Sequence, residues 1–110
     1  MGLSAGEAEG VGAAWVEAWN SGDGDRVIAL LHPSAVIADP SAPGGKVREP
    51  DVPDHVRARI AAGGTEVRDW IALAGVDSVA VICSLADGTR RADTLVLTDD
   101  GLIVRAMLHS

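Results

Sequence analysis

The C-terminal part of the chain, residues 65–109, reads TEVRDWIALAGVDSVAVICSLADGTRRADTLVLTDDGLIVRAMLH. Apolar and polar side chains alternate along most of it, and a period of two residues is typical of β-strands that bury one face. The alternation predicts successive strands near residues 65–74, 76–85, 89–98 and 102–109. They are separated by turn-forming residues, Ala74-Gly75, Asp87-Gly88 and Asp99-Asp100-Gly101. We therefore predict an antiparallel meander.

The residues that precede this meander have the period of helices instead. In residues 5–20 the apolar side chains recur at the spacing of one helical face, at Val11, Ala14, Trp15, Ala18 and Trp19. A second helix is predicted from an N-cap at Asp23 or Asp25 through RVIALLH, ending before Pro33. This helix would have only about two turns.

The middle of the chain predicts a strand, a loop and a third helix. The stretch AVIAD at residues 35–39 is β-branched and apolar, and Pro40 closes it because the residue before a proline favours extended geometry. Residues 40–50 then form a loop. The third helix begins near an N-cap at Asp51 or Asp54 and ends at Gly63-Gly64.

Helices followed by a meander predict an α+β fold. We expect one domain over residues 1–110, with three N-terminal helices against a mostly antiparallel, five-stranded sheet. The strands are apolar enough that the face without helices needs a partner, so we expect a homodimer through the outer face of the sheet. Trp70, which alternates with Glu66 and Arg68, is predicted to lie on that outer face.

Composition excludes several classes of function. Hydrophobic residues make up 47% of the 110 residues and charged residues 23%, which is too apolar for a disordered chain. The formal net charge of −7 disfavours nucleic acid as a partner. No apolar run is long enough to cross a bilayer and the N-terminus lacks a signal sequence, so we expect no membrane partner and a cytoplasmic location.

The residues that commonly bind metals are too scattered to form a site. Cys83 is the only cysteine and lies in the apolar run VAVICSL, so it is predicted to be a small buried hydrophobe. His32, His55 and His109 have no partner at metal-ligand spacing. We expect neither a metal nor a cofactor.

Two stretches resemble a known superfamily. The string AWNSGDGDRVIALLHPSAVIADP at residues 18–40 looks like ketosteroid isomerases and SnoaL-type polyketide cyclases, from helix one to the end of the first strand. So does RRADTLVLTDDGLIVRAML at residues 90–108. Both groups belong to the nuclear transport factor 2-like superfamily, and the resemblance implies its cone-shaped, cystatin-like fold, in which a curved sheet and three helices enclose a pocket.

The resemblance also implies catalytic residues. Asp39 falls where ketosteroid isomerases keep the general base, and Asp93 falls where they keep an acid that donates a hydrogen bond to the enolate oxygen. Trp15 stands where those enzymes have a tyrosine, and the chain contains no tyrosine. The implied activity is acid/base catalysis on an apolar carbonyl compound, by double-bond isomerisation or by aldol cyclisation of a polyketide.

Strand alternation places each acid at the end of an apolar stripe. Asp93 shares a face with Leu95, and Asp39 shares a face with Ile37. Burial would keep Asp93 neutral, whereas Arg91 on the same face would favour its ionised form. An ionised pair resembles limonene-type epoxide hydrolases, in which the aspartate helps to activate water.

The remaining candidate residues would contact a small apolar substrate. Trp15 and Trp19 would form the wall of the pocket, and His55 on the third helix could exchange a proton near neutral pH. The complete set of predicted substrate-binding residues is Trp15, Trp19, His55, Arg91, Leu95 and Met107. A non-catalytic module that holds an apolar ligand in the same fold is the alternative of a different class.

Overall fold

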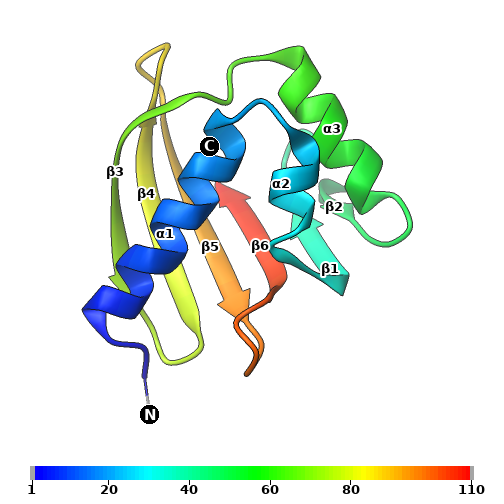
Figure 1. The fold of residues 1–110 in the computed structure, drawn as a ribbon. Helices are drawn as coiled ribbons and strands as arrows, with labels where there is room; N and C mark the ends of the chain where they lie inside the picture. The colour runs from blue at the N-terminus through cyan, green and yellow to red at the C-terminus, as the bar shows by residue number, and fades with distance from the viewer. Residues whose placement is uncertain (1, 110) are drawn as a thin grey trace.

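The computed structural model describes residues 2–109 and contains three α-helices and one curved sheet (Figure 1). The helices are α1 (Ala5–Asn20), α2 (Gly24–Ile28) and α3 (Val52–Ala62), with a 3₁₀ turn at Pro43–Gly45. The strands are β1 (Leu31–Ala38), β2 (Lys46–Val47), β3 (Val67–Ala74), β4 (Ser78–Leu85), β5 (Arg90–Leu97) and β6 (Ile103–His109). The predicted α+β class is confirmed.

The sheet has the strand order β2-β1-β6-β5-β4-β3. Strands β3 to β6 form the predicted antiparallel meander, whereas β1 lies parallel to β6. Six strands replace the predicted five, because Lys46 and Val47 pair with the end of β1 inside the predicted loop. A strand of two residues is too short to show any period in the sequence.

The second helix is shorter than predicted. Asp23 caps it through a hydrogen bond from the Asp25 backbone to its carboxylate, as expected, but the helix ends at Ile28. Leu31 and His32 belong instead to β1, where Leu31 pairs with Ile103. The helical prediction for Leu31 and His32 is therefore wrong. Pairing with β6 overrides the preference of this short apolar stretch for a helix.

Helix α1 covers the inner, concave face of the sheet (Figure 1). It packs closely on β3, where a Cβ on Gly12 would lie only 2.7 Å from the Trp70 ring. Trp70 thus faces the helix, and its predicted place on the outer face is wrong. The register shifts between Val67 and Asp69, and such a bulge reverses which residues face inward along the rest of the strand.

The outer face of the sheet carries exposed apolar side chains. Ile71 and Leu73 on β3 are 57% and 51% exposed, and Ile82 on β4 is 40% exposed. Ile71 lies directly opposite Ile82, and Leu73 lies opposite Ala80, so the apolar residues form two continuous rows across the strands.

Among residues 2–109, no helix is both long and apolar enough to span a bilayer.

Candidate functional site

The two predicted acids lie at the same level on the concave face of the sheet. Asp93 pairs with Leu108 of β6, and Ala38 of β1 pairs with Met107, so Asp39 follows one position further and also flanks Leu108. Both aspartates are buried, with 2% of Asp39 and none of Asp93 exposed. Because one strand separates them, their backbones are about 10 Å apart.

Asp93 is the centre of a buried polar cluster. The Trp15 indole Nε1 and the Arg91 Nη2 each donate a hydrogen bond to Oδ2 at 2.9 Å. Arg91 Nε lies 2.9 Å from Oδ1 as an ion-pair contact, although its N–H does not point along a hydrogen bond to that oxygen. The Trp19 ring lies edge-on to Trp15 at 5.6 Å and beside the Arg91 guanidinium, whose Cζ is 5.8 Å from its centre.

The contacts of Asp93 favour an ionised carboxylate. Indole and guanidinium N–H groups are donors only, so neither could accept a hydrogen bond from the hydroxyl of a neutral Asp93. A buried guanidinium also needs a counter-charge nearby, because burial of an unpaired charge is costly. Of the two forms that the sequence left open, the geometry supports the Arg91-paired carboxylate.

Asp39 is the centre of a second cluster at the end of β1. Its Oδ1 accepts hydrogen bonds from the Ser41 backbone at 2.9 Å and the Ser41 hydroxyl at 2.8 Å. Its Oδ2 lies 2.9 Å from His55 Nε2 and 3.0 Å from Arg59 Nη1. Both oxygens are occupied, so Asp39 cannot accept a further proton without losing one of these contacts.

The contacts of Asp39 lower its pKa. Burial raises the pKa of Asp39, but the hydrogen bonds from Ser41 and His55 and the charge of Arg59 outweigh burial and bring it below its usual value. Asp39 is therefore ionised at neutral pH. A buried ionised carboxylate that contacts one imidazole nitrogen is the arrangement that orients a histidine for proton transfer.

Helix α3 supplies the partners of Asp39. His55 and Arg59 are four residues apart and so project from the same side of the helix, and their side chains are 19% and 25% exposed. Neither Arg59 nor Ser41 is among the predicted site residues. The sequence signal for Arg59 is its i, i+4 spacing from His55. The signal for Ser41 is the Asx-turn pattern, in which the Asp39 side chain binds the backbone two residues further on.

The space next to Asp93 is filled by side chains. Trp15 and Trp19 are both almost fully buried, and Leu95 beside Asp93 has no exposed surface. Met107 alternates with buried Ala106 and Leu108 on β6, so it lies on the opposite face. Met107, which was predicted to bind substrate, therefore lies on the face of the sheet opposite to that of Asp93.

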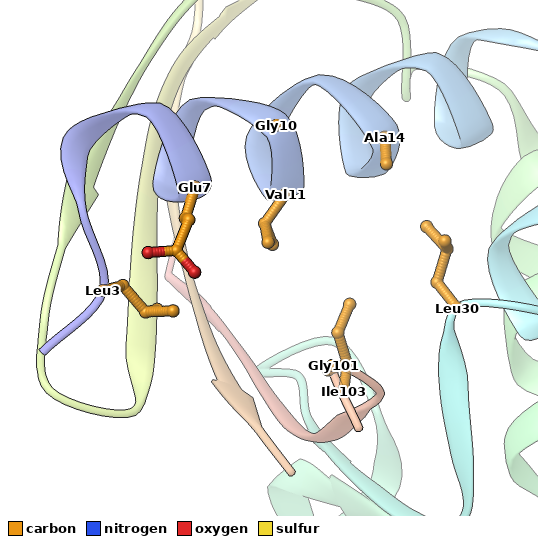
Figure 2. A pocket seen from close by; sticks show the side chains of 8 residues that line it. All are labelled: Leu3, Glu7, Gly10, Val11, Ala14, Leu30, Gly101 and Ile103. Carbon is orange, nitrogen blue, oxygen red and sulfur yellow. The ribbon is translucent and has the colours of Figure 1, made fainter. Parts of the chain in front are cut away.

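An open apolar cavity of about 390 Å³ lies between the first half of α1 and the start of β6. Figure 2 shows Val11 and Ala14 projecting from the helix toward Leu30 and Ile103 across this space. The carboxylate of Glu7 lies near the Leu3 end of the cavity. Trp15, which binds Asp93, is one helical turn beyond Val11, so the cavity and the buried cluster are neighbours along α1.

Residues 2–109 show no other reactive cluster. Cys83 is buried as predicted, and burial together with the nearby charge of Asp93 raises the pKa of its thiol, so it is a poor nucleophile. No group of three or more His, Cys, Asp or Glu side chains in this part of the chain is arranged to hold a metal ion.

Comparison with known proteins identifies the fold. No family model matches the sequence, and no curated protein matches it. Among solved structures, a SnoaL-like protein of unknown function from Burkholderia thailandensis has a TM-score of 0.85 at 24% identity, over 99% of this chain and 98% of that one.

Two further structures are similar at lower identity. The epoxide hydrolase/cyclase-like enzyme SalBIII, which acts in pyran ring formation in the polyether salinomycin, has a TM-score of 0.72 at 18% identity, over 94% of this chain and 90% of that one. A candidate polyketide cyclase from Xanthomonas campestris pv. campestris has a TM-score of 0.75 at 18% identity, over 94% and 89%. The chain therefore has the cystatin-like α+β fold that these solved structures share.

Proposed function

We propose that the protein is an acid/base enzyme that opens an epoxide in a small apolar compound, either with water or with a hydroxyl group of the same molecule. The observation that carries this proposal is the buried Arg91–Asp93 pair. A carboxylate paired with a guanidinium fits a general base better than a neutral hydrogen-bond donor. Similarity in fold to the epoxide hydrolase/cyclase-like enzyme SalBIII supports the same choice.

In the proposed reaction, the Asp93 cluster takes up one proton and the Asp39 cluster supplies one. Asp93 takes the proton of the attacking hydroxyl as its oxygen bonds to an epoxide carbon. The carbon–oxygen bond of the epoxide breaks, and the electron pair goes to the leaving oxygen. His55, held by Asp39 at 2.9 Å, then supplies the proton that converts this alkoxide into an alcohol.

Substrate access requires movement of the Trp15 indole. Asp93 has no exposed surface, and its carboxylate is hydrogen-bonded to Trp15. The apolar cavity beside Val11 and Ala14 is the proposed place where the hydrocarbon part of a substrate binds before the Trp15 side chain is displaced. Its volume of about 390 Å³ and its apolar lining fit a small hydrophobic molecule.

A panel of three substrates tests the reaction. We expect purified protein to convert an apolar epoxide to a diol, or a hydroxy-epoxide to a cyclic ether, with turnover above the uncatalysed rate measured by gas chromatography. A β,γ-unsaturated ketone should remain unchanged, because no neutral acid faces its enolate. Isomerisation of the ketone without epoxide opening would instead support the ketosteroid isomerase-like alternative.

The filled space beside Asp93 favours a second candidate, a non-catalytic module that binds an apolar ligand in the open cavity. Such a protein would bind small hydrophobic molecules and leave all three substrates unchanged. Filling the cavity distinguishes binding there from binding elsewhere. Gly10 lines the cavity, and a Cβ placed on it meets nothing within 4 Å apart from its own helix, so Gly10→Leu should occupy the cavity.

We also propose that two copies associate through the outer face of the sheet. A stable interface buries about 800 Å² per partner, and the two apolar rows that include Ile71, Leu73 and Ile82 supply its centre. We expect a dimer by light scattering after size exclusion. Ile71→Lys should weaken the association at least about 100-fold, because it places a charge in the centre of the apolar interface.

Val76→Lys is the matched control for this experiment. Val76 is 75% exposed but lies in the turn between β3 and β4, outside the paired rows. It should leave the dimer intact. A wild-type chain that stays monomeric at high micromolar concentration, or equal effects of the two lysine variants, would remove this interface from consideration.

A further inference from the structure

Two buried side chains beside Asp93 have N–H donors without a hydrogen-bond partner. Among residues 2–109, Trp19 Nε1, Arg91 Nε and Arg91 Nη1 form no hydrogen bond, although the two side chains are only 2% and 5% exposed. An unpaired buried donor costs about 1–3 kcal/mol, and more when the group is charged. Folded proteins rarely keep such groups without a use for them.

Two of these donors, Trp19 Nε1 and Arg91 Nη1, belong to neighbouring groups, because the Arg91 guanidinium lies over the Trp19 ring. The Arg91 Cζ is 5.8 Å from the centre of the Trp19 ring, and Nη1 is bonded to Cζ while Nε1 is a member of the ring. A hydrogen bond to oxygen is about 2.9 Å long, so a single oxygen can accept from two nitrogens only if they are no more than about 6 Å apart. The separation of the two groups is compatible with such a bridge.

The other donors of the cluster face Asp93, and Arg91 Nε lies 2.9 Å from its Oδ1 as an ion-pair contact. Trp15 Nε1 and Arg91 Nη2 both donate to Asp93 Oδ2 at 2.9 Å. The indole at position 15 is therefore committed to the carboxylate and is not free for a ligand. This leaves one neutral and one cationic donor, and both can only bind an acceptor.

We infer that Trp19 Nε1 and Arg91 Nη1 form an oxyanion-binding site, which takes the oxygen that gains negative charge during the reaction. This inference rests on the proposed function for the identity of that oxygen, the alkoxide released from an epoxide. The ligand class is broader: any small apolar molecule with an ionised or strongly accepting oxygen fits. Preformed donors in a water-free site stabilise such charge strongly.

The test uses Trp19→Phe, which removes the N–H and keeps one aromatic ring in place of the indole. Substituted phenols of graded acidity serve as probes, because their phenolates carry a negative oxygen on an apolar ring. Wild type should bind the more acidic phenols progressively more tightly, and Trp19→Phe should lose about 100-fold in phenolate affinity. The indole ¹H–¹⁵N signal of Trp19 should move downfield on binding, while that of Trp70 stays unchanged.

Stability separates this role from a structural one. Trp19→Phe removes a donor that has no partner, so urea unfolding should show a smaller loss of stability than Trp15→Phe, in which the buried ring shrinks by the same amount. Trp15→Phe is the matched control: it removes a donor that is hydrogen-bonded to Asp93, and it should be destabilised. Loss of phenolate affinity only in proportion to stability would overturn the inference.

The outcomes also separate this inference from the proposed function. If wild type opens no epoxide but binds phenolates through the Trp19 N–H, the oxyanion site stands and the epoxide proposal falls. If wild type opens epoxides and Trp19→Phe matches it in both kcat and phenolate affinity, the oxyanion site falls alone.

Discussion

Replacement of Asp93 by asparagine is expected to lower both turnover and stability more than any other single isosteric change. The asparagine cannot take a proton from the attacking hydroxyl, so turnover of the epoxide should fall by about 10²–10⁴-fold. It also leaves the buried Arg91 guanidinium without a counter-charge. Removing one partner of a buried ion pair costs about 3–5 kcal/mol, and urea unfolding of Asp93→Asn should show a loss of this order.

A double variant distinguishes the two effects. Replacing both partners, as Arg91→Met with Asp93→Leu, removes the desolvation cost together with the attraction, and such replacements are often neutral or stabilising. We expect the double variant to recover most of the lost stability and none of the turnover. Asp69→Asn, an exposed carboxylate on β3, is the control and should change neither property. Full turnover by Asp93→Asn would exclude Asp93 as the base.

The sequence predicted the parts of the fold that rest on repeated local patterns. The strand periodicity from residue 67 onward, the turn glycines and the helical face of α1 each extend over many residues or over a fixed turn geometry. Gly88 and Gly101 have φ angles of 89° and 84°, the positive range for which a glycine is favoured in a hairpin.

The features that the sequence did not predict depend on single positions or on distant partners. Trp70 faces inward because one bulge shifts the register of β3, and no residue near it marks that bulge in the sequence. Leu31 is extended because Ile103, far along the chain, pairs with it. Both errors arise where tertiary pairing overrides a local preference.

The candidate site was likewise predicted only in part. Alternation along β1 and β5 was sufficient to place Asp39 and Asp93 on the buried face, as the structure shows. It could not give their partners, because the contacts of Asp39 with His55 and Arg59 connect a strand end to a helix more than fifteen residues later. The protonation state of Asp93 likewise depended on whether the Arg91 side chain turned toward it.

The hydrogen bonds of Asp39 predict a loss of stability in acid. Because its pKa is lower in the folded chain than its usual value of 3.8, the folded state binds a proton less readily than the unfolded state. The contribution of Asp39 is therefore complete above about pH 5 and is lost as the pH falls through its folded pKa. Urea unfolding between pH 7 and pH 3 should show this decline.

Asp39→Asn should remove that part of the acid dependence. It should also lower the free energy of unfolding by about 2 kcal/mol at pH 7, because the amide keeps one acceptor oxygen but loses the charge that holds Arg59. Asp87→Asn is the matched control. Hydrogen bonds from Thr89 also lower the pKa of Asp87, but this carboxylate is exposed in a turn. Water can replace most of the hydrogen bonds that Asp87→Asn weakens, so this variant should change stability little. Equal pH profiles for wild type and Asp39→Asn would show that Asp39 is not the group that couples the fold to acid, and the orientation of His55 would then need another explanation.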